Sequence, residues 1–266
     1  MPVHLLYPSN PLRLKQPDEQ YLAEVEAVRL VGFNVSLFSL EDFQIGSFRP
    51  FPPLPHGVKI LYRGWMLSAT DYESLTAALL GCGVEPFTDV QSYLATHYLP
   101  NWYPLISELT PETRVYPSNC ELELELRRLD WPEYFIKDYV KSLKTSIGSR
   151  ISKPEQVTMV AAEMRRFRGT IEGGFCVRRV ENYFTETEQR YFVLDRQPHG
   201  ISPGVPAIVN ECAKRIPSRF YSIDVVKRTD GQHRIVEIGD GQVSDLVGWT
   251  PEQFSRMLAA SISNRP

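Results

Sequence analysis

Long apolar runs are missing from the sequence, and none approaches the roughly 18 residues that a membrane-spanning helix needs. The N-terminal segment has neither a charged stretch nor a long apolar core, so no signal peptide is expected. Positive charge is not in excess either, since the formal net charge is −3. This balance argues against dependence on a nucleic-acid backbone or an anionic membrane surface. We therefore expect neither nucleic-acid nor membrane partners.

Cysteine is scarce, and its spacing is wide and irregular. The four residues are Cys82, Cys120, Cys176 and Cys212, with no CxxC pair. This spacing supports neither a zinc site nor a disulfide framework. Reduced and mostly buried thiols are expected instead, as in a cytoplasmic protein.

Several catalytic signatures are absent as well. The chain contains no GxGxxG, GxxxxGK[ST], HExxH or GxSxG pattern, and its five histidines show no metal-ligand spacing. These absences argue against dinucleotide-binding Rossmann, P-loop, zincin and serine-hydrolase proteins.

The composition is that of a folded globular chain, with 42% hydrophobic and 23% charged residues among 266. Short apolar runs alternate with helical patterns over roughly the first 95 residues, which predicts a parallel α/β layer. From residue 134 the pattern favours antiparallel strands and helices. Residues 174–183 and 190–194 are expected to pair as neighbouring strands, and residues 101–116 to be irregular.

Two β-type runs flank Asp230-Gly231, the strongest short-range hairpin signal. Centring the turn there places Asp224 directly opposite Glu237. Like charges about 5 Å apart destabilise an antiparallel pair, so the two acids need a cation between them or a proton on one. With Asp240 at the strand end, three hard oxygen donors favour a Mg²⁺ site. The alternative is an exposed edge hairpin with scattered acids, and a three-residue loop with a bulge would shift the register by one.

Lysines gather in the segment that begins at residue 135. Lys137 and Lys141 are four residues apart, a spacing that places them on one face of a strand or of a helix. Lys144 follows three residues later. A lysine among apolar and aromatic neighbours favours an anionic partner such as phosphate. A solvated basic face is the alternative.

Three arginines are further candidates. Arg178 and Arg190 lie in strand-like segments, where a guanidinium can bind a carboxylate or phosphate through two parallel hydrogen bonds. Ion pairs on the surface are the alternative. Arg63 ends the third N-terminal strand, and ligands bind at strand carboxyl ends in open α/β sheets. Structural stacking on Trp65 is the alternative there.

The order of these motifs resembles the ATP-grasp superfamily. The matching stretches are residues 135–142, 177–181, 188–190, 222–224 and 237–241. The chain is similar in particular to the clade with an arginine-and-two-lysines signature. The resemblance implies a Rossmann-like α/β pre-ATP-grasp layer over residues 1–97. An α+β ATP-grasp fold would follow over residues 98–266.

The resemblance also implies ATP and Mg²⁺ as cofactors. Lys137 and Lys141 would contact ATP phosphates, with Lys144 in the same group, and Glu181 would line the adenine and ribose pocket. Asp224 and Glu237 match the metal acids.

The third metal ligand departs from the family pattern. Many members have asparagine two residues after the glutamate, where this chain has Gly239. The neighbouring Asp240 is expected to ligate in its place.

The implied activity is ATP-dependent ligation of a carboxylate to an amine through an acylphosphate. Arg190 or Arg178 would stabilise the acylphosphate, and Arg63 would hold the acceptor, a small molecule or a peptide. A non-catalytic nucleotide-binding or interaction protein is one alternative, and a phosphotransferase on the same fold is another. The sequence leaves the assembly open, a homodimer being the commonest kind.

Overall fold

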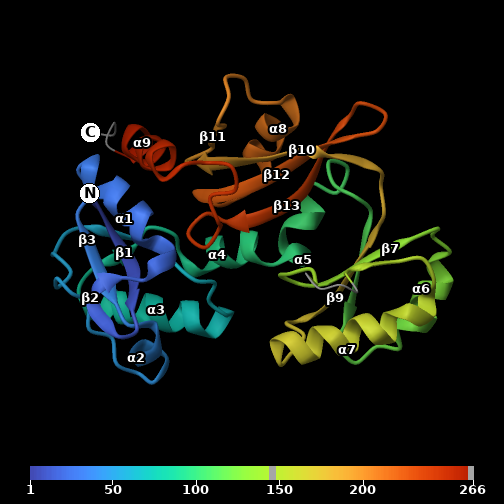
Figure 1. The fold of residues 1–266 in the computed structure, drawn as a ribbon, viewed down its shortest axis with the longest axis horizontal. Coiled ribbons are helices and arrows are strands. Elements are labelled where there is room, and N and C mark those ends of the chain that lie inside the picture. The colour runs from blue at the N-terminus through green and yellow to red at the C-terminus, as the bar shows by residue number, and fades with distance from the viewer. Residues whose placement is uncertain (144–147, 263–266) are drawn as a thin grey trace.

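The computed structural model describes residues 1–143 and 148–262, and its N-terminal part is a mainly parallel sheet (Figure 1). β1 (Val3–Asn10) pairs in parallel with β3 (Val35–Phe38) and β4 (Lys59–Tyr62), and β4 pairs in parallel with β5 (Glu85–Pro86). β2 (Arg13–Pro17) turns back antiparallel on the end of β1. The parallel pairing agrees with the alternating sequence pattern.

Helices cover both faces of this sheet. Leu5 and Tyr7 of β1 pack with Val25 of α1 (Leu22–Leu30), whereas Leu6 packs with Leu75 of α3 (Ala69–Gly81). Successive side chains of a strand point to opposite faces, so these contacts place α1 and α3 on opposite sides. The short helix α2 (Leu40–Gln44) follows β3.

The C-terminal sheet is antiparallel, in the order β11 (Gln197–His199), β10 (Tyr183–Leu194), β12 (Phe220–Arg228) and β13 (His233–Asp240). α8 (Ala207–Arg215) packs on one face, and α9 (Pro251–Ile262) packs on the other. Phe254 of α9 contacts the same apolar cluster as α1. The C-terminal sheet is therefore joined to the N-terminal layer through α9.

A third sheet has the order β6 (Thr113–Pro117), β9 (Gly174–Arg179), β7 (Tyr134–Asp138) and β8 (Arg150–Ile151), all antiparallel. α6 (Leu122–Leu129) and α7 (Val157–Arg168) cover one face. We call this continuous stretch, described over residues 113–143 and 148–179, the inserted lobe. In Figure 1 it lies at the lower right, beneath the C-terminal sheet.

Two expectations are corrected here. The strands over 174–179 and 183–194 do not pair with each other, because β9 belongs to the inserted lobe and β10 to the C-terminal sheet. Alternation identifies a strand without identifying its partner. Residues 101–116 are not irregular throughout, since they contain the end of α5 (Leu99–Trp102) and most of β6.

Short elements complete the chain. α4 (Val90–His97) and α5 run between the three sheets, in the centre of Figure 1. The 3₁₀ turns are η1 (Glu19–Tyr21), η2 (Tyr103–Leu105) and η3 (Pro154–Gln156). Within the described ranges, no helix combines the length and apolarity needed to cross a membrane. The four cysteines are unpaired; Cys176 and Cys212 are buried, Cys120 is partly buried and Cys82 is exposed.

Candidate functional site

The hairpin of β12 and β13 brings the two central acids together. Asp224 is the cross-strand partner of Glu237, as the sequence predicts. The next pair is Val225 with Ile235, so Val236 is an extra residue that forms a β-bulge. Gly231 has a φ of +90°, which favours glycine in the turn. The turn alone would give the shifted register, and the bulge restores the facing of the two carboxylates.

Each facing carboxylate is paired with its own cation. Arg190, the neighbour of Asp224 on β10, donates from Nε and Nη2 to the two Asp224 oxygens at 2.7 and 2.6 Å. Lys137 reaches from β7 of the inserted lobe, and its Nζ lies 3.0 Å from Glu237 Oε1. The side chains of Arg190 and Asp224 are 11% and 7% exposed, so this pair is almost dry. The repulsion between the acids is thus offset by two cations from different sheets.

The two acids differ in proton affinity. Burial raises the pKa of Asp224, and the opposing effect of Arg190 does not fully offset it. Burial also acts to raise the pKa of Glu237, but the charge and hydrogen bond of Lys137, with Arg190 and Arg178, outweigh it and lower that pKa. Glu237 is therefore held in its ionised, acceptor-only form, as a cation ligand must be.

Lys141 lies elsewhere than its spacing from Lys137 indicates. β7 ends at Asp138, and the carboxylate of Asp138 accepts from the backbone N–H of Val140 and Lys141 in a turn. The two lysines therefore do not share a face of one strand. Lys141 lines a pocket of about 200 Å³ together with His97 and Glu172. Lys144 lies outside the described residues.

The guanidinium of Arg178 is buried and holds backbone. It donates to the carbonyl of Val236, the bulged residue, and to Thr110 Oγ1 at 2.6 Å. Its Nε is buried without a hydrogen-bond partner among the described residues. These contacts assign Arg178 to the bulge that sets the register of the acids, in place of the expected contact with an acylphosphate.

Arg63 is saturated by the protein itself. It donates to both oxygens of Glu24, each at 2.7 Å, and to the carbonyls of Gly241 and Ser244 at 2.8 and 2.9 Å. It is 1% exposed and lies over the ring of Phe254. This geometry contradicts the expectation that Arg63 holds an acceptor, because its fork is committed to joining the N-terminal layer to the chain after β13.

Asp240 does not join the other two acids. It is three residues from Glu237 along β13, so the two side chains point to opposite faces. Its carboxylate accepts from the Gln242 backbone N–H at 3.0 Å, from Gln242 Nε2 at 3.1 Å and from Thr96 at 3.4 Å. Burial raises its pKa to about 7. Asp240 therefore packs against α4, and the expectation that it completes a metal site is not met.

Asp240 gives the fold a specific pH dependence. Its pKa is about 7 in the folded chain and about 3.9 when unfolded, so between these values the folded chain holds a proton that the unfolded chain has lost. Stability must then fall as pH rises through this window. Asp240→Asn, of the same shape, should remove up to about 1.4 kcal/mol per pH unit of that fall. Urea unfolding of both proteins at about pH 5 and about pH 7 measures it; parallel pH profiles would contradict the assignment.

Gly239 explains the missing asparagine. A Cβ at this position would lie 2.9 Å from Ser244 Oγ and 3.3 Å from Ser222 Oγ. These two hydroxyls are hydrogen-bonded to each other at 2.8 Å. The place beside Glu237 on that strand face is therefore occupied by a serine pair.

Glu181 lies between the inserted lobe and the C-terminal sheet, and its partner was not anticipated from the sequence. Both of its oxygens accept from Arg234 of β13, each at 2.9 Å. Tyr183 donates to the same carboxylate at 3.1 Å. An arginine in a strand facing solvent or core gives no sequence signal of such a contact, since Glu181 is 53 residues away.

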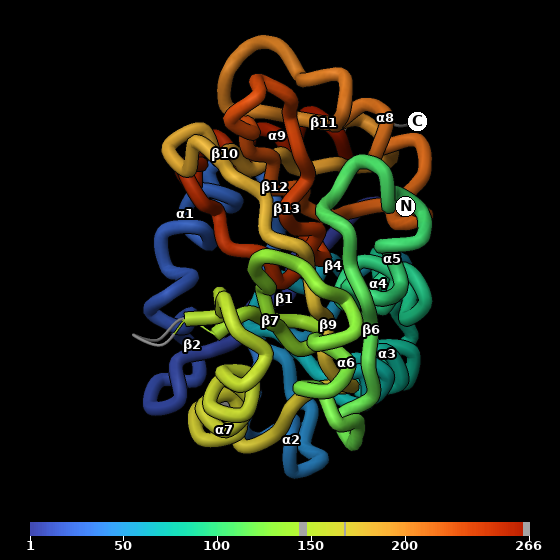
Figure 2. Tube along the Cα trace, turned by 90° about the vertical axis from the view of Figure 1, so that its right-hand side faces the viewer, coloured from blue at the N-terminus to red at the C-terminus, as the bar shows by residue number. Residues whose placement is uncertain are grey.

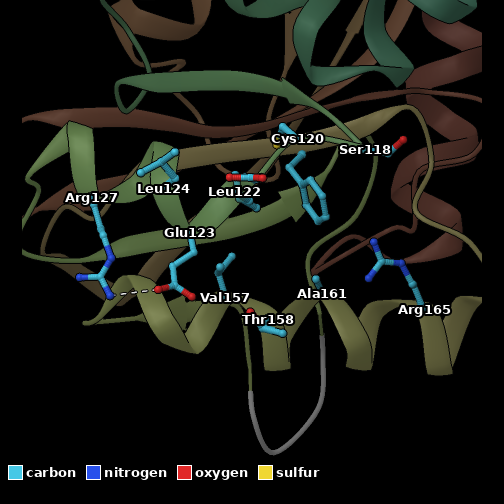
Figure 3. A pocket seen from close by; sticks show the side chains of 12 residues that line it. Ser118, Cys120, Leu122, Glu123, Leu124, Arg127, Val157, Thr158, Ala161 and Arg165 are labelled. Atoms are coloured by element: carbon cyan, nitrogen blue, oxygen red, sulfur yellow. Dashed lines mark hydrogen bonds and ion pairs between the residues drawn. The ribbon is translucent and has the colours of Figure 1, made fainter.

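The largest of the described pockets lies away from these residues. It measures about 470 Å³ and is formed by α6, α7 and the segment before α6, including Cys120, Leu122, Arg127, Thr158 and Arg165 (Figure 3). Arg127 and Glu123 form an ion pair at its rim. None of the predicted site residues lines it. Volume alone therefore does not locate the candidate site.

Comparison with solved structures defines the fold. D-cycloserine synthetase DcsG matches with a TM-score of 0.63 at 12% identity, covering 98% of this chain and 100% of its own. An ATP-grasp RimK domain protein from Sphaerobacter thermophilus DSM 20745 matches at 0.64 and 16%, covering 99% and 100%. The ATP-grasp ligase PsnB, solved with a phosphomimetic precursor variant, Mg and ADP, matches at 0.59 and 12%, covering 98% and 97%. The chain thus has the ATP-grasp fold.

The family follows from the sequence. A family model for the ATP-grasp domain of the arginine-and-two-lysines clade, family 3, matches residues 102–258, and the chain belongs to this family. This confirms the resemblance to the ATP-grasp superfamily. A search of curated proteins found no significant match.

Proposed function

We propose that this protein is an ATP-dependent carboxylate–amine ligase that forms an amide or peptide bond through an acylphosphate. The observation that carries the proposal is the facing of Asp224 and Glu237, with Lys137 brought to them from the inserted lobe. Membership of the arginine-and-two-lysines clade supports it, as do structural neighbours that are a synthetase and a ligase. Residues 1–97 would form the Rossmann-like pre-ATP-grasp domain and residues 98–266 the ATP-grasp domain.

The donor set fits Mg²⁺ held jointly with a nucleotide. No group of three His, Cys, Asp or Glu side chains suited to a metal occurs in the described part of the chain. Mg²⁺ commonly takes one or two carboxylates and completes its shell with water and substrate phosphates, so Asp224 and Glu237 suffice. When bound, the ion would offset phosphate charge and orient the γ-phosphoryl group.

The cations have separate roles in this proposal. Lys137, now against Glu237, would turn to a phosphate once Mg²⁺ offsets the charge of that acid. Arg190 would keep Asp224 oriented and lie beside the transferred phosphoryl group. Lys141 is a second phosphate contact, and Glu181 marks the adenine side. Arg178 and Arg63 are left out because their guanidinium groups bind the protein's own carbonyls and side chains.

The reaction has two steps. A substrate carboxylate oxygen attacks the γ-phosphorus, and ADP leaves with the bond electrons. The amine nitrogen then attacks the acyl carbon, phosphate leaves, and the nitrogen loses a proton. Such transfers depend on positioning and charge stabilisation more than on a protein nucleophile, which matches a site of cations and carboxylates.

ADP release in the presence of pooled carboxylates and amines tests the proposal. Turnover that needs one member of each pool, with an amide as product, is the expected result. A stable phosphorylated product without amine would instead indicate a phosphotransferase. Nucleotide binding without turnover across broad pools would indicate a non-catalytic binding protein.

A further inference from the structure

Arg234 makes an unusually complete set of contacts at the base of β13. Its Nε and Nη2 donate to the two oxygens of Glu181, each at 2.9 Å. Its Nη1 donates to the carbonyl of Glu108 and its Nη2 to that of Thr110, each at 2.6 Å. The side chains of Arg234 and Glu181 are only 14% and 16% exposed. Such parallel, charge-assisted bonds fix geometry as well as charge.

The residues that Arg234 holds lie on the two connections of the inserted lobe. The lobe is one continuous stretch, so the chain enters it through residues 106–112 and leaves it through residues 180–182. Figure 2 shows the entering segment, in green, running down from the level of the C-terminal sheet into β6. Glu108 and Thr110 lie on the entry, and Glu181 lies on the exit. One side chain of the C-terminal sheet therefore fastens both crossings.

Neighbouring contacts fasten the entry to the bulge of β13. The backbone N–H of Ile235 donates to the Leu109 carbonyl at 3.0 Å, and Thr110 Oγ1 donates to the Ile235 carbonyl at 2.8 Å. Arg178, from the lobe itself, donates to the Val236 carbonyl. The entry, the exit and the bulge thus form one hydrogen-bonded unit.

We infer that Arg234 is a positioning residue that sets the orientation of the inserted lobe against the C-terminal sheet. This inference rests on the proposed function, because the paired groups are those of the proposed MgATP site. Lys137 belongs to the lobe, whereas Asp224 and Glu237 belong to the sheet. Rotation about the two crossings would separate Lys137 from the acids, and misplacement by about 1 Å can cost a hundredfold in function.

Titration calorimetry with Mg-ADP tests the inference on the full chain. Arg234→Ala should bind Mg-ADP at least about tenfold more weakly than the wild type, since it frees both crossings. Guanidinium chloride at low, non-denaturing concentration should restore part of the affinity, because the ion can occupy the fork between Glu181 and the carbonyls. Arg228→Ala is the matched control: Arg228 lies 3.8 Å from Glu181, pairs mainly with Asp230, and should change affinity little.

The outcomes separate the two claims. A wild type that does not bind Mg-ADP would overturn the proposed function together with the inference. A wild type that binds, with a folded Arg234→Ala variant of equal affinity, would overturn the inference alone. If Arg234→Ala does not fold, Arg234→Lys keeps the charge without the fork. Wild-type affinity in that variant would equally overturn it, and a loss without guanidinium rescue in the alanine variant would reduce Arg234 to a structural role.

Discussion

Glu237→Gln is expected to lower ATP turnover by at least about a hundredfold while the fold stays intact. Glutamine has the same shape but lacks the charge that a shared cation needs. Glu237 is half-exposed, with 46% of its side chain accessible, so the substitution leaves no cavity. Lys137→Ala should have a comparable effect on turnover, because it removes the cation that the inserted lobe contributes.

The control is Glu26→Gln on the exposed face of α1, which removes the same charge far from the hairpin. Circular dichroism should show all three variants folded. ADP release at saturating substrates measures the effect. Turnover in Glu237→Gln equal to that of the Glu26→Gln control would remove Glu237 from the site.

Arg63→Ala is expected to destabilise the protein by about 3–5 kcal/mol, the usual cost of leaving one partner of a buried ion pair unpaired. Glu24 is 5% exposed and would lose both bidentate contacts, keeping only its hydrogen bond from Tyr7. The carbonyls of Gly241 and Ser244 would lose their donor as well. Denaturant unfolding measures the loss.

A double variant separates charge from packing. Arg63→Met with Glu24→Gln removes both charges and should recover a large part of the lost stability. Nucleotide affinity should stay near wild type wherever the variants fold. An Arg63→Ala protein with unchanged stability and a selective loss of acceptor-dependent turnover would show instead that Arg63 serves the substrate.

The hairpin acids could be predicted because their positions depend on local signals. Asp230-Gly231 fixes the turn, and alternation fixes the facing of Asp224 and Glu237. The bulge at Val236 could not be foreseen, since it depends on Arg178 and on the entry segment beside β13. The centred turn and the bulged structure lead to the same facing pair by different routes. The capping box Thr250–Gln253 was equally local, and both of its hydrogen bonds are present.

Contacts between distant segments could not be predicted. Arg63 follows a strand as ligand-binding residues do, but its partner Glu24 lies 39 residues earlier. β6 was hidden because most of its residues are exposed, so it carries little apolar signal. Asp240 was assigned by its closeness in sequence to Glu237, whereas strand parity turns it toward α4. In each case the missing information was the spatial neighbour, which a single sequence does not contain.

The central claim is that Asp224 and Glu237 hold Mg²⁺ together with a nucleotide. Titration calorimetry of ADP with and without Mg²⁺, on the wild type and on Glu237→Gln, tests it most directly. The account predicts that Mg²⁺ strengthens ADP binding to the wild type at least about tenfold and has little effect on the variant. ADP binding that responds equally to Mg²⁺ in both proteins would contradict it.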